Sequence, residues 1–148
     1  MIYLTVHDLV WINTVVTGAV PSYDYVTLEA CMAGQYRYGV SDDPLAQSAG
    51  LVGRLLSKRP FKSGNRRTAF VGTVAFLNAN GYAIAVDDGA AASLIRSAER
   101  CERTPLDTVK ALVTPASGPL PDGLTLRKLV GHLCNHHAEA LKALSDND

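Results

Sequence analysis

The chain has 148 residues, a length typical of one domain with a single substantial core. Its hydrophobic content of 47% and charged content of 19% exclude a disordered or fibrous protein. Fourteen basic residues balance fourteen acidic ones, so the overall charge predicts no general attraction to nucleic acid or membranes.

The cysteine usage and the N-terminal sequence favour a cytoplasmic protein. Cys31, Cys101 and Cys134 are odd in number and lack paired spacing, which predicts free thiols in a reducing cytosol. The N-terminus has no basic n-region. The charge-free stretch at residues 9–20 is too short and too polar to span a membrane. We therefore expect a soluble protein with no membrane partner.

The start of the chain predicts two short helices. Thr5 followed by Asp8 has the spacing of a capping box, and apolar residues at helical spacing continue towards Gly18, where this helix is expected to end. Asp24 is expected to cap a second helix, which Gly34 interrupts.

The middle of the chain predicts a flap and two longer helices. Residues 35–40 have a β-leaning composition and predict a short extended flap. Asp43 followed by Pro44 opens a third helix, which is expected to run to Ser57. After a basic loop, residues 65–80 are apolar almost all the way round. A helix with so little polar face is expected to be central and buried.

The remaining segments predict further helices and one boundary. Residues 82–86 predict a short extended connector, and residues 114–123 hold three prolines and two glycines, which predict a loop or a domain boundary. Three helices are expected here: one capped by Asp87 or Asp88 and running to Ala98, one from Thr104-Pro105 to Leu112, and one from Leu124 to about Leu144.

The sum is an all-α fold, a helical bundle around the buried helix at residues 65–80, with one possible small β-hairpin flap. Residues 1–113 are expected to form the main domain. Residues 114–148 are expected to add a proline- and glycine-rich loop and a C-terminal helix packed on it.

A basic, glycine-containing loop at residues 58–69 leads directly into that central helix. No acidic residue occurs between Asp43 and Asp87, whereas six basic residues do: Arg54, Lys58, Arg59, Lys62, Arg66 and Arg67. A glycine loop at a helix start, surrounded by arginines, is typical of an anion site. Phosphate is the first ligand that this pattern indicates.

The run RPFKSGNRR at residues 59–67 resembles the signature of the Fic/Doc (Fido) fold, HPFx(D/E)GN(K/R)R. The run LNANGY at residues 77–82 resembles the death-on-curing branch of that family, and so does the opening YLT at residues 3–5 with Asp8-Leu9 and Ile12-Asn13. The resemblance covers roughly residues 3–112. It implies transfer of a phosphate-containing group from ATP or another nucleotide to a protein hydroxyl. Most members transfer AMP, whereas the death-on-curing toxins transfer the terminal phosphate.

The resemblance also implies roles for the loop residues. Gly64, Asn65, Arg66 and Arg67 stand in the positions that hold the phosphates, together with backbone N–H groups at the helix start. The family's first position is a histidine that accepts the proton of the attacking hydroxyl, and its acidic position holds Mg²⁺.

Arg59 and Ser63 occupy those two catalytic positions here. Arginine stays protonated and cannot act as a base, and serine is a far poorer Mg²⁺ ligand than a carboxylate. We therefore expect nucleotide or phosphate binding with weak or lost catalysis, and a doubtful role for Mg²⁺. Arg59 could instead add a phosphate contact in place of the metal. Arginine at position 59 and serine at position 63 have two alternative explanations, which are natural decay of the gene copy and deliberate inactivation of a toxic protein.

Two functions stay open at the level of the sequence. One is a nucleotide-dependent protein-modifying toxin with a degenerate site. The other is a non-enzymatic binding module that works through an antitoxin-like or other protein partner. The chain shows no (S/T)xxxE(G/N) inhibitory motif, so an antitoxin is expected on a separate chain.

The flap at Tyr36, Arg37 and Tyr38 has two interpretations. In the Fic pattern, a flap before the motif helix aligns the target protein by β-pairing, and these residues are candidates for that role. A polar loop with half-packed tyrosines is the alternative.

The last helix contains His132, Cys134, His136 and His137. His132 and His136 are four residues apart and share one helix face, a spacing that can chelate a metal. No HExxH glutamate accompanies them, and ordinary surface histidines are the expected interpretation. We assign no metal ligand.

Overall fold

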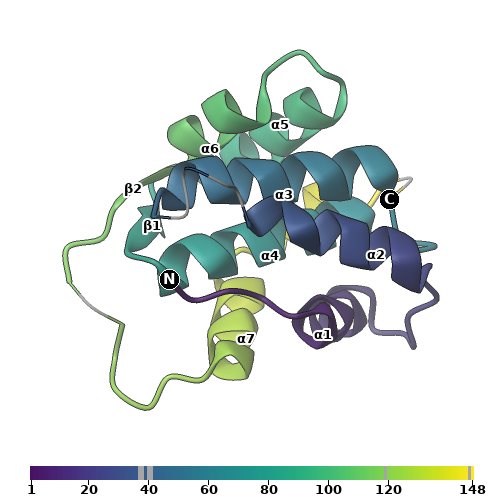
Figure 1. Cartoon of the computed structure of the whole chain (residues 1–148), viewed down its shortest axis with the longest axis horizontal. Coiled ribbons are helices and arrows are strands. Elements are labelled where there is room, and N and C mark those ends of the chain that lie inside the picture. The colour runs from purple at the N-terminus through teal and green to yellow at the C-terminus, as the bar shows by residue number, and fades with distance from the viewer. Residues whose placement is uncertain (37–38, 40–41, 119, 147) are drawn as a thin grey trace.

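The structure is a computed structural model that describes residues 1–36, 39, 42–118, 120–146 and 148. Within these residues the elements are α1 (Val6–Thr17), α2 (Tyr25–Met32), the short 3-10 helix η1 (Ala33–Gln35), α3 (Pro44–Lys58), α4 (Asn65–Ala79), β1 (Tyr82–Ile84), α5 (Asp88–Glu99), α6 (Pro105–Leu112), β2 (Val113–Pro115), α7 (Leu126–His136) and α8 (Ala138–Leu144). The all-α fold with a small sheet is confirmed (Figure 1).

Side-chain caps begin most of the helices, as their sequences predict. Thr5 and Asp8 form a complete capping box at α1, in which the Thr5 hydroxyl accepts from the backbone N–H of Asp8. Asp24, Asp43 and Asp87 cap α2, α3 and α5 by accepting the N–H three residues further on. Each such cap satisfies one backbone donor that the first helical turn leaves free.

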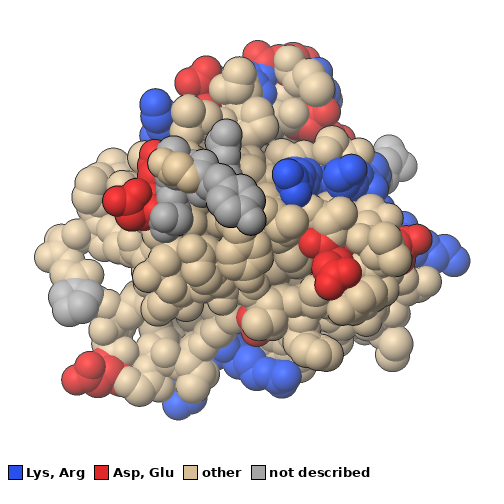
Figure 2. Space-filling view, in the orientation of Figure 1, with Lys and Arg blue, Asp and Glu red and all other residues tan. Residues whose placement is uncertain are grey.

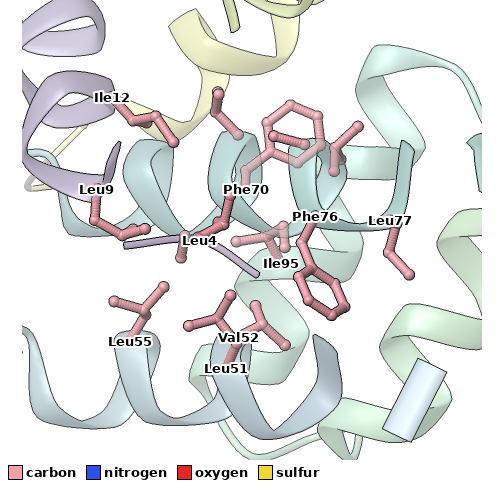
Figure 3. Packing of buried hydrophobic residues seen from close by; sticks show 14 of the residues in the cluster. Leu4, Leu9, Ile12, Leu51, Val52, Leu55, Phe70, Phe76, Leu77 and Ile95 are labelled. Atoms are coloured by element: carbon pink, nitrogen blue, oxygen red, sulfur yellow. The ribbon is translucent and has the colours of Figure 1, made fainter. Parts of the chain in front are cut away.

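Helix α4 lies at the centre of the bundle, with α1, α3 and α7 packed around it (Figure 1). Twelve of its residues, from Asn65 to Leu77, are buried. Figure 3 shows Leu51, Val52 and Leu55 of α3 directed towards the side of the core that Phe76 enters. The central, buried helix predicted for residues 65–80 is therefore confirmed. Its burial fixes the position of the loop that precedes it.

The small sheet pairs β1 with β2 in antiparallel register, with Ala83 opposite Thr114. It therefore joins the extended connector predicted at residues 82–86 to the first residues of the proline-rich loop. The segment predicted as a flap forms no part of this sheet in its described residues. Gln35 ends η1, and Tyr36 stacks on Tyr3 with ring centroids 4.6 Å apart. Arg37, Tyr38 and Val40 lie outside the described residues.

The single last helix predicted from Leu124 to about Leu144 is wrong, because the chain breaks at His137 into α7 and α8. Neither glycine nor proline marks this break in the sequence. Instead, His137 is buried, its Nδ1 lies 2.9 Å from Asp88 Oδ1, and its ring meets Phe70 edge-on. These tertiary contacts favour the break, which directs α8 against α5. Residues of both α7 and α8 join the hydrophobic core.

None of the helices in the described residues combines the length and apolar character needed to cross a membrane.

The three cysteines are free thiols, as predicted, and they differ in accessibility. Burial raises the pKa of Cys31 to about 11 and also raises the pKa of Cys134, whereas Cys101 is exposed. Since the thiolate is the reactive form, we expect one fast-reacting thiol in the folded protein at pH 8 and two more after unfolding. Labelling with a chromogenic disulfide reagent measures this. Cys101→Ser is expected to remove the fast phase, and a fast phase that survives would contradict the assignment.

Candidate functional site

The basic loop is held in place by an extended segment from the α1–α2 connection. Tyr23 and Phe61 form an antiparallel β-bridge, with the N–H of Asp24 donating to the Pro60 carbonyl (3.0 Å) and the N–H of Lys62 donating to the Ser22 carbonyl (2.8 Å). The rings of Tyr23 and Phe61 lie 5.8 Å apart. The loop is therefore one strand of a minimal ladder, with its backbone fixed before α4 begins.

Asn65 completes this arrangement from the first residue of α4. Its side-chain amide accepts from the Phe61 N–H (3.0 Å) and donates to the Phe61 carbonyl (2.7 Å). Both backbone groups of Phe61 that point away from Tyr23 are thus satisfied, and Asn65 is buried. The Asn65 side chain shapes the loop here, and its expected contact with phosphate stays a prediction.

Gly64 is required by both backbone conformation and space. Its φ is +77°, and a Cβ at this position would lie 2.5 Å from Thr17 Cγ2 and 2.9 Å from Asn13 Nδ2. The Asn13 amide donates to the Ser63 carbonyl (2.9 Å) and to the Thr68 hydroxyl (3.0 Å). The turn into α4 is therefore packed tightly against α1, and α1 holds it through Asn13.

The start of α4 already holds an anionic group, the side-chain carboxylate of Asp148. The backbone N–H of Arg66 donates to Asp148 Oδ1 (2.6 Å), and the N–H of Arg67 donates to Oδ2 (3.3 Å). The Arg67 guanidinium adds a bond from Nε to Oδ2 (2.8 Å), while its Nη1 donates to the Val16 carbonyl (2.7 Å). Two helix-start N–H groups and one arginine thus converge on one carboxylate, the geometry of an anion site.

The Arg66 side chain binds a second carboxylate and is almost fully buried, with 7% of the residue's surface exposed. Its Nε lies 2.8 and 3.0 Å from the two carboxylate oxygens of Glu99 on α5. Another guanidinium nitrogen donates to the carbonyls of Leu144 (3.2 Å) and Asp146 (2.6 Å). Arg66 therefore joins α4 to α5 and to the end of α8.

Arg59 and Ser63 occupy the two positions expected to carry chemistry. Arg59 ends α3 with a left-handed backbone (φ 45°), and its guanidinium lies 3.3 Å from Glu99, which it shares with Arg66. Ser63 is exposed. The carboxylates beside the loop, Glu99 and Asp148, are both bound by arginine. Mg²⁺ is usually held through one or two carboxylates, and an exposed serine beside carboxylates that are already paired with arginine does not fit it.

The structure brings six of the predicted residues together at one end of α4: Arg59, Ser63, Gly64, Asn65, Arg66 and Arg67. It places Tyr36 elsewhere, on Tyr3, whose ring in turn neighbours Phe76 near the other end of α4. The extended segment that pairs with the loop is residues 22–24, and not the segment that was predicted as a flap. Figure 2 shows basic side chains gathered over α3 towards the end that leads into the loop.

Sequence reasoning missed Asn13, Glu99 and Asp148 as parts of the site. Asn13 lies beside the apolar residue Ile12 in α1 and is buried, and a buried polar side chain has a specific hydrogen-bond partner. Glu99 lies 33 residues from Arg66, and Asp148 lies 81 residues from Arg67. No local pattern in the sequence marks either carboxylate.

In the described part of the chain, no three His, Cys, Asp or Glu side chains come together as a possible metal-ligand group. The rings of His136 and His137 meet edge-on, 4.8 Å apart.

No protein-family model matches this sequence, and comparison with curated proteins and with solved structures finds no significant match. The functional argument therefore depends on the loop motif and on the contacts at the start of α4.

Proposed function

We propose that the start of α4 binds the phosphate group of a nucleotide such as ATP, and that the protein is of the Fido type with weak or lost transfer activity. The observation that carries this proposal is the convergence of two backbone N–H groups and the Arg67 guanidinium on one carboxylate. These donors suit any small oxyanion. A phosphate group offers more oxygens and more negative charge than a carboxylate, so it is the stronger ligand for them.

The reaction class comes from the resemblance of residues 59–67 to the Fido signature. It supports transfer of a terminal phosphate or of AMP to a protein hydroxyl as the ancestral activity. The side chains at the two catalytic positions support weak catalysis. The Arg59 guanidinium stays protonated and pairs with Glu99, so it accepts no proton from an attacking hydroxyl. Ser63 supplies no carboxylate for a metal ion.

Isothermal titration calorimetry with ATP tests the binding proposal. Arg67→Gln is expected to weaken ATP binding about 10-fold to 100-fold, because a charge-assisted hydrogen bond is worth about 1.5–3 kcal/mol. Arg103→Gln is the matched control, since it removes the same charge from an exposed position between α5 and α6. Equal losses in both variants would point to a general charge effect and contradict the site.

Titrating ATP with and without Mg²⁺ tests both the role of the metal and the choice between a nucleotide site and a non-enzymatic binding module. Binding that ignores Mg²⁺ would support the site as described, with fixed arginine charge in place of the metal. If neither the native protein nor Asp148→Asn, which removes the charge of the carboxylate held at the start of α4, binds ATP or inorganic phosphate, the nucleotide proposal fails. The non-enzymatic module with a separate antitoxin-like partner is then the better account.

A further inference from the structure

Resting on the proposed function, we infer that Arg59 recognises the bound phosphate group: its guanidinium leaves Glu99 and binds the anion at the start of α4. Arg67 already provides one guanidinium at this site. A second guanidinium suits an anion that carries two negative charges, such as inorganic phosphate or the terminal phosphate of a nucleotide. Arg59 would thus select a phosphate dianion over a singly charged anion.

Glu99 is bound by two arginines that hold it unequally. Arg66 Nε lies 2.8 and 3.0 Å from the two carboxylate oxygens, whereas Arg59 makes one contact of 3.3 Å with Oε2. The Arg59 side chain is 39% exposed, and Arg66 is buried. The Arg59–Glu99 pair therefore contributes little, because water screens it. Arg59 can leave Glu99 while Arg66 keeps that carboxylate paired.

The backbone of Arg59 is fixed beside the start of α4, so the inferred movement involves the side chain alone. Arg59 is the residue at which α3 ends. Two residues further on, both backbone groups of Phe61 are bound by the side chain of Asn65, the first residue of α4. The Glu99 carboxylate contacts the guanidinium groups of Arg59 and Arg66, and the backbone N–H of Arg66 belongs to the anion site. The Arg59 guanidinium is therefore a neighbour of that site before any ligand binds.

A phosphate group offers Arg59 a stronger partner than Glu99 does. The Glu99 carboxylate is a single charge that two guanidinium groups share. A phosphate dianion brings two charges and more oxygens, and arginine binds phosphate through two parallel N–H···O bonds. The exchange replaces one long, partly exposed contact with a charge-assisted pair, so the free energy favours the phosphate complex.

Three substitutions in the intact chain test this inference. Arg59→Gln removes the guanidinium charge, and Arg59→Lys keeps the charge without the paired N–H donors. Arg100→Gln is the matched control, because it removes the same charge from the exposed residue next to Glu99. We expect Arg59→Gln to bind inorganic phosphate and ATP about 10-fold more weakly than the native protein. Arg59→Lys is expected to lose about 3-fold, and Arg100→Gln less than about 2-fold by screened long-range charge.

The NMR signal of the Arg59 Nε–H group separates recognition of phosphate from a purely structural role. This signal is assigned by its absence from the spectrum of Arg59→Lys. It is expected to shift on addition of inorganic phosphate and to saturate together with the backbone N–H signals of Arg66 and Arg67. An Arg59 that stays on Glu99 would leave its signal unmoved while those backbone signals shift, and this result would overturn the inference.

Calorimetry with inorganic phosphate and ATP, on variants that keep the native circular dichroism spectrum, decides the affinities. The variants are made in the native chain, or in Asp148→Asn if only that protein binds. Unchanged affinity in Arg59→Gln, with binding still weakened in Arg67→Gln, would overturn the inference and leave the proposed function intact. Equal losses in Arg59→Gln and Arg100→Gln would also overturn it, because a general charge effect would then explain both. No binding in either background would overturn the proposed function itself.

Discussion

Replacing Gly64 by alanine is expected to lower the free energy of unfolding by about 2–5 kcal/mol. A left-handed backbone costs a residue with a Cβ about 1–2 kcal/mol. Overpacking adds about 1–3 kcal/mol, because the new Cβ would overlap the Thr17 methyl group and the Asn13 amide. Neither neighbour can move freely, since Asn13 holds the Ser63 carbonyl and the Thr68 hydroxyl, and the Thr17 hydroxyl donates to the Asn13 carbonyl. Urea denaturation followed by circular dichroism measures the loss.

Gly18→Ala is the matched control for this prediction. Gly18 has a similar φ of +69°, but a Cβ there would meet no atom within 4 Å. Gly18→Ala is therefore expected to lower the free energy of unfolding only by the cost of the left-handed backbone, about 1–2 kcal/mol. If the two variants lose the same stability, the tight packing of the loop on α1 plays no part. The glycine of the motif would then need another explanation.

Restoring the two catalytic positions together, Arg59→His with Ser63→Asp, is expected to raise group transfer by at least about 100-fold. A positioned base alone typically contributes about 10²–10⁴-fold, and a metal ligand adds charge stabilisation. Histidine tolerates the left-handed backbone at position 59 better than most residues. The loss of the partly exposed Arg59–Glu99 pair costs little, since Arg66 keeps Glu99 in place.

Transfer of labelled phosphate or AMP to cell extract in the presence of Mg²⁺ measures this gain. Lys58→His with Lys62→Asp introduces the same residue types one position earlier in the loop, and it is expected to gain nothing. Native protein that labels a target as well as the restored variant does would contradict the degenerate-site account.

The fold was predictable because its signals are local. Thr5 with Asp8, and Asp43 with Pro44, mark helix starts through contacts within one turn. The burial of the helix at residues 65–80 was predictable because its residues are apolar almost all the way round. The break at His137 has no such signal, since it depends on Asp88 and Phe70, which come from other helices.

The site was predictable only in part, because charge balance is a long-range property. The absence of acidic residues between Asp43 and Asp87 suggested a strongly electropositive loop. In the folded chain, Glu99 pairs with two arginines and Asp148 with a third. The residues of the anion site follow from the motif, whereas its occupant does not.

The most direct test of the anion site is an NMR titration of isotope-labelled protein with ATP, read at the backbone amides. The account predicts the largest shifts at the N–H groups of Arg66 and Arg67, with a smaller change at Asp148 as its carboxylate leaves. Saturable shifts confined to other parts of the chain, with the amides of Arg66 and Arg67 unmoved, would contradict it.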